Sequence, residues 1–210
     1  MNSTSHKQAV HSIYKAIAVF LFCFLWLTPL YPESIPDNVQ GIMDSSTFIR
    51  TQKPFAVRTD RKTLEYFIEH VEELSKYEKD YNKKEPILEV KGNNRYGVQI
   101  PSKHVTGEFS LVERQPQRVI YMGHGNAASI FNFSGYVILV VDYATQADDI
   151  GSYEEVRTSV YVKFDNALLA FVAKVASPFV IPKLDKFMTK FSTKTKKAIE
   201  YAYAIRKGTK

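Results

Sequence analysis

The chain has 210 residues, a length that fits one folded domain with an appendage and excludes two large cores. Apolar residues make up 45% and charged residues 24%, a balance that excludes general intrinsic disorder. The net charge of +6 is concentrated in residues 183–210, with nine Lys or Arg against two acids, whereas residues 33–182 hold 17 basic and 20 acidic residues. No nucleic-acid-binding motif accompanies this basic end, so we expect no nucleic acid partner.

Residues 1–31 are predicted to be a signal peptide or an N-terminal membrane anchor. Twelve uninterrupted apolar residues (16–27, AIAVFLFCFLWL) follow Lys7 and Lys15, which is typical of a secretory signal. The run is shorter than the roughly 20 residues of a spanning helix. No small-x-small cleavage triplet follows it cleanly, so an uncleaved anchor remains open, as does a buried core helix. We expect an exported protein, periplasmic, secreted or anchored to a membrane. Its single cysteine, Cys23, permits no intramolecular disulfide.

A Pro-, Asp- and Ser-rich stretch, residues 32–46, is predicted to be a linker before a domain at 47–210. The domain begins with a predicted strand at Thr47–Val57. Asp60 then caps a short helix, and a second short helix is expected at Glu72–Tyr81. The first helix has one apolar face, made of Leu64, Phe67, Ile68 and Val71.

Six further strands follow, because the apolar period changes from 3.6 to 2. A hairpin around Gly92-Asn93-Asn94 joins the first two. The last strand alternates most cleanly, with Val156, Thr158, Val160, Val162 and Phe164 on one side and polar residues on the other. This alternation predicts a sheet with one buried face and one face in water. The six ranges are 87–91, 95–100, 105–114, 118–124, 130–143 and 154–165.

The C-terminal region is predicted to be helical, with an apolar helix at 166–176 and a longer helix after Pro178 and Pro182. One face of the long helix is apolar over more than five turns, so it must lie along the sheet. That face comprises Leu184, Phe187, Met188, Phe191, Thr195, Ala198, Ala202 and Ile205. A second face carries the lysine stripe, which we define as Lys183, Lys186, Lys190, Lys194 and Lys197.

This order of elements predicts an α+β fold: a curved, seven-stranded antiparallel sheet around a long C-terminal helix, with two short helices after the first strand. It resembles the helix-grip, START/Bet v 1-like superfamily, which includes polyketide cyclase-like and coenzyme Q-binding proteins. The segment VYVKFDNALLAFVAKVASPFVIPKLDKFM, which runs from the last strand into the last helix, carries the same resemblance. The resemblance implies binding or transport of a lipid, sterol or quinone between sheet and helix, with enzymes as a minority.

The resemblance and the geometry both point to a cavity, because one straight helix cannot touch a curved sheet everywhere. An apolar gap stays dry or takes an apolar guest. The alternative is a closed core filled by the same side chains. The predicted ligand-binding residues are Phe109, Phe133, Val137, Leu139, Val160, Val162, Phe164, Leu184, Phe187, Met188 and Phe191.

Signals for catalysis, cofactors and metals are weak, so no catalytic residue, cofactor or metal is predicted. The string Gly123–Ala128 resembles a dinucleotide fingerprint, but a strand follows it, which predicts a loose turn instead. A cyclase- or hydrolase-like enzyme is the alternative function and would use His124 or Asp142 as a buried acid or base. A membrane-tethered interaction module with a filled core is a third hypothesis. Tyr121 and Tyr136 are candidate hydrogen-bond donors to a ligand; Tyr161 is discounted, because the alternation of the last strand places it on the outward face.

The lysine stripe and residues 167–182 are candidates for contact with an anionic membrane surface. Residues 167–182 are too short and too proline-rich to span a bilayer, but they could dip into lipid or gate the cavity. A solvated helix face and a helix packed on the sheet edge are the alternative interpretations.

Overall fold

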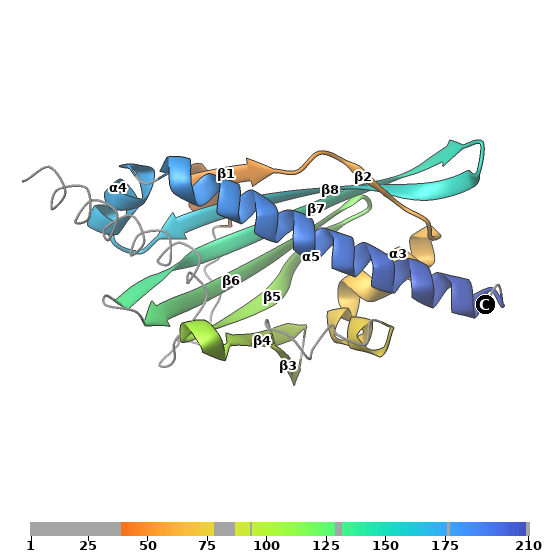
Figure 1. Ribbon diagram of the computed structural model, residues 1–210, viewed down its shortest axis with the longest axis horizontal. Helices are drawn as coiled ribbons and strands as arrows, with labels where there is room; N and C mark the ends of the chain where they lie inside the picture. Colours follow the sequence, from red (N-terminus) through yellow and green to blue (C-terminus); the bar gives the residue numbers. More distant parts are fainter. Residues whose placement is uncertain (1–38, 78–86, 93, 129–131, 176, 209–210) are drawn as a thin grey trace, which may run out of the picture.

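The computed structural model describes residues 39–77, 87–92, 94–128, 132–175 and 177–208. Within these ranges an eight-stranded antiparallel sheet is crossed by one long C-terminal helix (Figure 1). The predicted α+β class is confirmed, and the arrangement is helix-grip-like. The helices, in chain order, are α2 (Val39–Asp44), α3 (Arg61–Glu69), the 3₁₀ helices η1 (Val71–Lys76) and η2 (Pro101–Lys103), α4 (Ala167–Val175) and α5 (Ser177–Arg206). The strands are β1 (Phe48–Thr51), β2 (Phe55–Val57), β3 (Ile87–Gly92), β4 (Arg95–Ile100), β5 (Val105–Gln115), β6 (Arg118–Ala128), β7 (Asn132–Asp148) and β8 (Gly151–Phe164).

The strand order in the sheet is β1-β8-β7-β6-β5-β4-β3, and β2 also pairs with β8. Eight strands are present where seven were predicted, because the expected first strand is divided into β1 and β2. Pro54 lies between the two, and proline cannot donate a hydrogen bond to a ladder. Both pieces pair antiparallel with β8, so together they form one edge of the sheet.

The two short helices follow β2, close to where they were predicted. The side chain of Asp60 accepts a hydrogen bond from the Thr63 backbone N–H (2.7 Å), which confirms it as the cap of α3. Leu64, Phe67 and Ile68 are buried on the predicted apolar face. The second helix is the 3₁₀ helix η1, which begins one residue earlier than expected; residues 78–81 of the predicted helix lie outside the described ranges.

Two antiparallel hairpins shape the sheet. In the β3–β4 turn, Gly92 and Asn94 have φ of +83° and +56°, left-handed values that glycine and asparagine adopt most readily. The β7–β8 hairpin is much longer than predicted, because β7 continues to Asp148 and β8 begins at Gly151. Among the described side chains, Val137, Leu139 and Val141 of β7 share the inner face with Val156, Thr158, Val160 and Val162 of β8, as predicted.

Helix α5 lies across one face of the sheet, with α4 near its first residues and α3 near its last turns (Figure 1). It begins at Ser177, earlier than the two prolines suggested. Pro178 sits in the first turn, where backbone N–H groups have no partner inside the helix. Pro182 removes one internal hydrogen bond without ending the helix. The prediction of a break there is therefore wrong.

The alternation in β8 predicted an outer face exposed to water. Part of that face is covered instead. Ile42 of α2 is buried on a cluster formed by Ile120, Met122, Ile138 and Val140. Strands β6 and β7 are apolar on both faces, and α2 covers the outer one. Residues 39–44 belong to the predicted linker, so the folded part begins before residue 47; residues 1–38, with the predicted signal or anchor, lie outside the described ranges.

One buried charge is held where α3 meets β7 and β8. Glu154 is fully buried, and its carboxylate accepts hydrogen bonds from Arg61 Nε (3.0 Å) and Thr145 Oγ1 (2.7 Å). A buried carboxylate without such partners would be very unfavourable. The Arg61–Glu154 ion pair therefore fixes α3 against the end of the β7–β8 hairpin.

Candidate functional site

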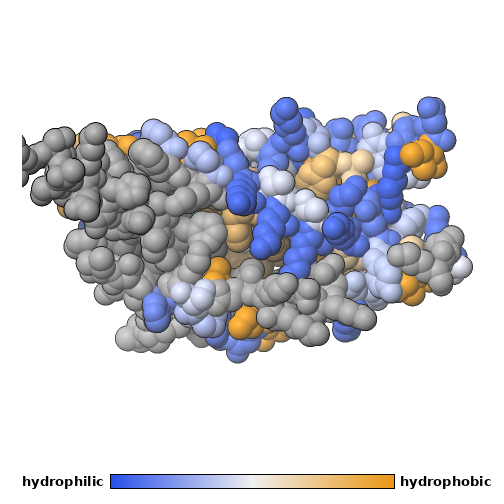
Figure 2. Space-filling view, in the orientation of Figure 1, coloured by the Kyte–Doolittle hydropathy of each residue, from blue (hydrophilic) through white to orange (hydrophobic). Residues whose placement is uncertain are grey.

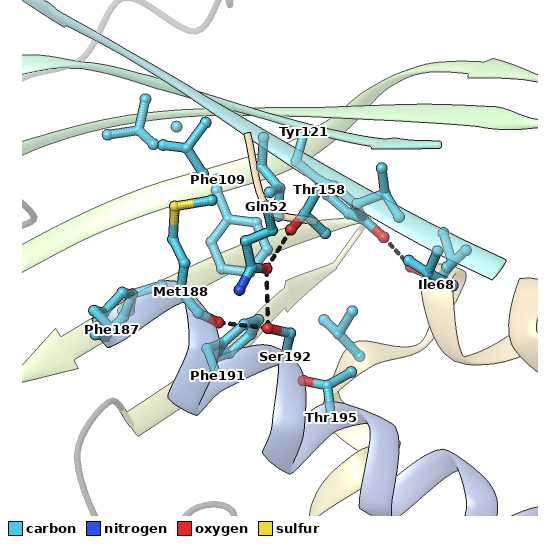
Figure 3. Close-up of a pocket in the computed structure, with 18 of the residues that line it drawn as sticks. Gln52, Ile68, Phe109, Tyr121, Thr158, Phe187, Met188, Phe191, Ser192 and Thr195 are labelled. Atoms are coloured by element: carbon cyan, nitrogen blue, oxygen red, sulfur yellow. Dashed lines mark hydrogen bonds between the residues drawn. The ribbon is translucent and has the colours of Figure 1, made fainter. Parts of the chain in front are cut away.

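A cavity of about 340 Å³ lies between the concave face of the sheet and α5. This volume is at the lower end of the range of small-molecule sites, roughly 300–1,000 Å³. Most of its lining is aliphatic or aromatic, supplied by the sheet, α3, η1 and α5. Figure 3 shows the Met188 side chain reaching from α5 toward Phe109 on the sheet, with Phe187 and Phe191 on the same part of the helix. The described side chains therefore leave open space here, which the alternative of a closed core does not predict.

Nine of the eleven predicted ligand-binding residues line this cavity: Phe109, Val137, Leu139, Val160, Val162, Leu184, Phe187, Met188 and Phe191. Phe164 does not. It is buried in a separate cluster with Phe48 and Ala173, beneath α4, because β8 has passed the end of the cavity there. The side chain of Phe133 lies outside the described part of the chain.

Many lining residues were not predicted. Leu64, Ile68 and Leu74 close one end of the cavity from α3 and η1, and Val98 and Ile100 extend it onto β4. The periodicity of residues 64–71 already showed an apolar face. A pattern within one helix does not say what that face packs against, so its part in the cavity could not be read from the sequence.

Glycines leave part of the sheet wall without side chains. Gly107 of β5 and Gly123 of β6 both line the cavity. A Cβ atom on Gly123 would lie 3.0 Å from the Glu108 carbonyl oxygen, and one on Gly107 would lie 3.1 Å from the His124 carbonyl oxygen. Backbones of adjacent strands therefore approach closely here, and the lack of side chains adds to the open volume.

A small polar group interrupts the apolar lining. The Thr158 hydroxyl donates a hydrogen bond to the Gln52 side-chain carbonyl oxygen (2.5 Å), and Ser192 Oγ lies 3.0 Å from that same oxygen. The Ser192 hydroxyl also donates to the Met188 backbone carbonyl oxygen, one turn earlier in α5 (2.5 Å). Figure 3 shows Gln52 between Thr158 and Ser192. We call Gln52, Thr158 and Ser192 the polar triad.

Of the tyrosines considered as ligand contacts, one lines the cavity and two lie on the outer face of the sheet, where Tyr161 was expected. Tyr121 lines the cavity, and its hydroxyl donates to the Ile68 carbonyl oxygen at the end of α3. Tyr136 and Tyr161 pack in the outer-face cluster under α2. A fourth residue, Tyr96, donates to the Glu69 carbonyl oxygen (2.8 Å); burial, with Glu72 nearby, raises its pKa to about 12. Tyr96 and Tyr121 thus bind the sheet to α3.

Neither predicted acid or base reaches the cavity. Asp142 forms an ion pair with Arg118 (2.6 Å). His124 lies 2.8 Å from the Asp165 carboxylate and packs against the Tyr136 ring. Both residues alternate with cavity-lining neighbours and point to the outer face.

Charged residues of the lining are paired. Glu108 pairs with Arg95 (2.9 Å), and Lys196 pairs with Glu200 (3.0 Å) and donates to the Ala56 carbonyl oxygen. Among the described residues, no three His, Cys, Asp or Glu side chains come together as a metal site would require. The string Gly123–Ala128 lies within strand β6, so the predicted loose turn is wrong.

Lysines and an apolar face lie on the outside of α4 and α5. Lys186, Lys190 and Lys197 are exposed, Lys194 is half-buried, and the Lys183 side chain is outside the described part. Hydrophilic residues gather along the α5 side of the molecule (Figure 2). On α4, Leu168, Phe171 and Val175 are 68%, 65% and 67% exposed. No helix within the described ranges is long and apolar enough to cross a membrane.

Comparison with known proteins finds remote structural similarity and no sequence relative. No protein-family model matches the chain, and no curated protein matches it. A hypothetical protein from Helicobacter pylori, known as a crystal structure, is 13% identical with a TM-score of 0.44; the match covers 83% of this chain and 98% of that one. A putative uncharacterized protein from Rhizobium leguminosarum is 9% identical with a TM-score of 0.36, covering 68% and 96%.

Proposed function

We propose that this protein binds and carries a hydrophobic small molecule in the cavity between its sheet and α5. The observation that carries the proposal is the cavity itself: about 340 Å³, lined mainly by aliphatic and aromatic side chains. Each methylene that a guest moves from water into such a site contributes about 0.8 kcal/mol. A lipid, sterol or quinone is the ligand class that the START/Bet v 1-like resemblance favours.

The two other hypotheses have less support. An interaction module with a filled core would not need an apolar cavity of this size. A cyclase- or hydrolase-like enzyme would need an acid or base facing the ligand, and His124 and Asp142 point to the other face of the sheet. Binding is therefore the function that the geometry supports best.

Native mass spectrometry of protein purified from cells without detergent tests the proposal. We expect a mass above that of the apoprotein, and lipid extraction should recover one class of apolar molecule. Replacing Phe187 with Trp should shift the affinity for that molecule, because Phe187 lines the cavity. Recovering no apolar molecule across several preparations would contradict the carrier proposal.

A second proposal concerns where the cargo is exchanged. We infer that the protein is exported and meets an anionic membrane surface through α4 and the lysine stripe. Three exposed apolar residues on one face of α4 are the specific observation that favours this, since large apolar side chains gathered on a surface mark interaction sites. Lys174 on the same helix and Lys186 and Lys190 on α5 are exposed and would attract anionic headgroups.

Vesicle sedimentation tests the membrane contact. Phe171→Ser should reduce binding to vesicles of phosphatidylcholine with 30% phosphatidylglycerol by about tenfold, because the phenyl ring would no longer be buried in the interface. Ile150→Ser is the control, since Ile150 is also a large apolar residue and is even more exposed, but lies at the tip of the β7–β8 hairpin, far from α4 (Figure 1). Equal loss in both variants would contradict a docking role for α4.

A further inference from the structure

We propose that the polar triad selects the cargo: the ligand carries one uncharged hydrogen-bonding group, such as a ketone, ester or hydroxyl, on an otherwise apolar body. This inference rests on the proposed carrier function and names the chemistry of the ligand. It excludes two neighbouring classes as preferred cargo, plain hydrocarbons and fatty-acid anions.

Three separate elements bring the triad together inside the cavity. Gln52 lies between β1 and β2, Thr158 is on β8, and Ser192 is on α5. Thr158 is the polar member of an inward row that is otherwise Val156, Val160 and Val162. Valine has the same shape as threonine, so an apolar residue would fill the same space. A hydroxyl at this position therefore has a role beyond packing.

Not all of the triad's hydrogen-bonding capacity is used within the described residues. The single Ser192 proton is shared between the Met188 backbone carbonyl oxygen and the Gln52 side-chain oxygen, and Ser192 Oγ can still accept a hydrogen bond through its lone pairs. The Gln52 amide nitrogen has two protons, and its contact in the described part is Thr189 Oγ1 at 3.5 Å, too long for a strong bond. A ligand carbonyl could accept from this amide, and a ligand hydroxyl could donate to Ser192 or Thr158.

The charges around the cavity argue against an anionic ligand. The cation of the lining is Lys196, and its ammonium group already contacts the Glu200 carboxylate and the Ala56 carbonyl oxygen. Glu200 also accepts from the Arg58 backbone N–H (2.7 Å), which holds the carboxylate in place. A fatty-acid carboxylate would have to displace these partners or remain unpaired in an apolar site, which is costly.

Three probes with the same number of carbon atoms test the selection: butylbenzene, its ketone butyrophenone, and 4-phenylbutyrate. Each is titrated against the full-length protein loaded with the neutral dye N-phenyl-1-naphthylamine, and the displacement midpoint is measured. The informative quantity is the affinity ratio of ketone to hydrocarbon, compared between wild type and variants. We expect Thr158→Val to lower the affinity for butyrophenone about fivefold, because the Gln52 amide that donates to the ketone loses the hydroxyl that holds it in place, and to leave butylbenzene within twofold.

Thr51→Val is the matched control. Thr51 Oγ1 lies 2.9 Å from Ser159 Oγ, so this variant also loses a hydroxyl contact with β8, but outside the cavity lining. Its affinity ratio should equal that of the wild type. Ser192→Ala is a second test, because alanine is favourable in a helix and removes only the hydroxyl.

Each outcome distinguishes the two proposals. An unchanged ratio in both Thr158→Val and Ser192→Ala would overturn the role of the triad and leave the carrier function standing. Tightest binding of 4-phenylbutyrate would also overturn it and would point to Lys196 instead. If the dye does not bind, or no probe displaces it, the carrier function fails and the triad proposal fails with it.

Discussion

The two halves of α5 share one sequence pattern but have different surroundings. In the C-terminal half, Ala198, Ile199 and Ala202 are buried in the core cluster with Leu64 and Phe67 of α3. In the N-terminal half, Leu184, Phe187 and Phe191 line the cavity, and Phe191 is 38% exposed. Both halves show the same apolar stripe, yet the N-terminal half mainly faces the cavity, whereas in the C-terminal half Ala198 and Ala202 pack in the core and Ile199 lies at the border of the two.

The difference comes from what lies between helix and sheet. Helices α3 and η1 place Phe67, Ile68 and Leu74 in the space under the C-terminal half, and small alanines let α5 approach them. The cavity extends beyond them toward the N-terminal half, where the opposite wall is the sheet. Stability should therefore depend mainly on one half of α5, and ligand binding mainly on the other.

The largest expected effect is in the closed half. Phe67→Ala should lower the free energy of unfolding by about 4 kcal/mol, because the phenyl ring is almost fully buried and its removal leaves a cavity. Phe187→Ala, the matched change in the open half, should cost about 1 kcal/mol or less, since that ring lines existing open space. Urea unfolding measures both. Equal losses would contradict the division of α5 into two halves.

The next effect concerns the buried charge that fixes α3. Arg61→Met should lower the free energy of unfolding by about 3 kcal/mol, because the Glu154 carboxylate would stay buried without its cation. The double variant Arg61→Met, Glu154→Leu should recover most of this loss, since no charge is then buried. Urea unfolding of the three proteins is the measurement. A double variant as unstable as the single one would show that Arg61 acts through packing alone.

In the open half we expect a smaller effect, and on ligand binding instead of on stability. Val160→Phe places a larger ring in the cavity and should weaken binding of N-phenyl-1-naphthylamine at least tenfold. Its free energy of unfolding should change by less than about 1 kcal/mol, because the added carbons fill open space instead of overpacking a core. Val160→Ala, which enlarges the cavity, should retain dye binding. Dye binding unchanged in Val160→Phe would place the ligand elsewhere.

Sequence periodicity predicted the helix and the sheet that form the cavity, but not the division of α5, because both halves carry the same apolar period. The 3.6-residue period of residues 184–205 and the two-residue period of residues 154–165 identified the walls, and most predicted lining residues face the cavity. Phe164 shows why alternation is not enough: it has the right parity but lies beyond the cavity, under α4. Alternation along a strand shows which face a residue lies on. It does not show how far along the strand the cavity extends.

Contacts between residues distant in the sequence could not be predicted from the periodicity either. Gln52 lies in a connection without apolar period, and only pairing of β1 and β2 with β8 brings it to Thr158. Helix α2 was taken for a linker because six residues with one buried isoleucine give almost no periodic signal. In both cases a partner distant in the sequence determines the contact.

The smallest predicted effect lies where β8 leads into α4, beside the open half. Burial would raise the pKa of Asp165, but hydrogen bonds from the His124 and Ser134 side chains outweigh it and hold the pKa below its usual value. A lowered carboxyl pKa stabilises the fold above the unfolded pKa of about 4, and that stability is lost as the pH falls through the folded value.

Asp165→Asn should therefore cost about 1 kcal/mol at pH 7, a figure reduced for solvent screening because the side chain is about one-third exposed. The difference in the free energy of unfolding between this variant and the wild type should shrink below about pH 4, as wild-type Asp165 becomes protonated. Urea unfolding at pH 7 and at pH 3 measures both values. Asp142→Asn, which breaks a surface ion pair with Arg118, is the control and should change stability by less than about 0.5 kcal/mol. A loss in Asp165→Asn that is equally large at both pH values would mean that the carboxylate charge contributes nothing, and that shape alone connects β8 to α4.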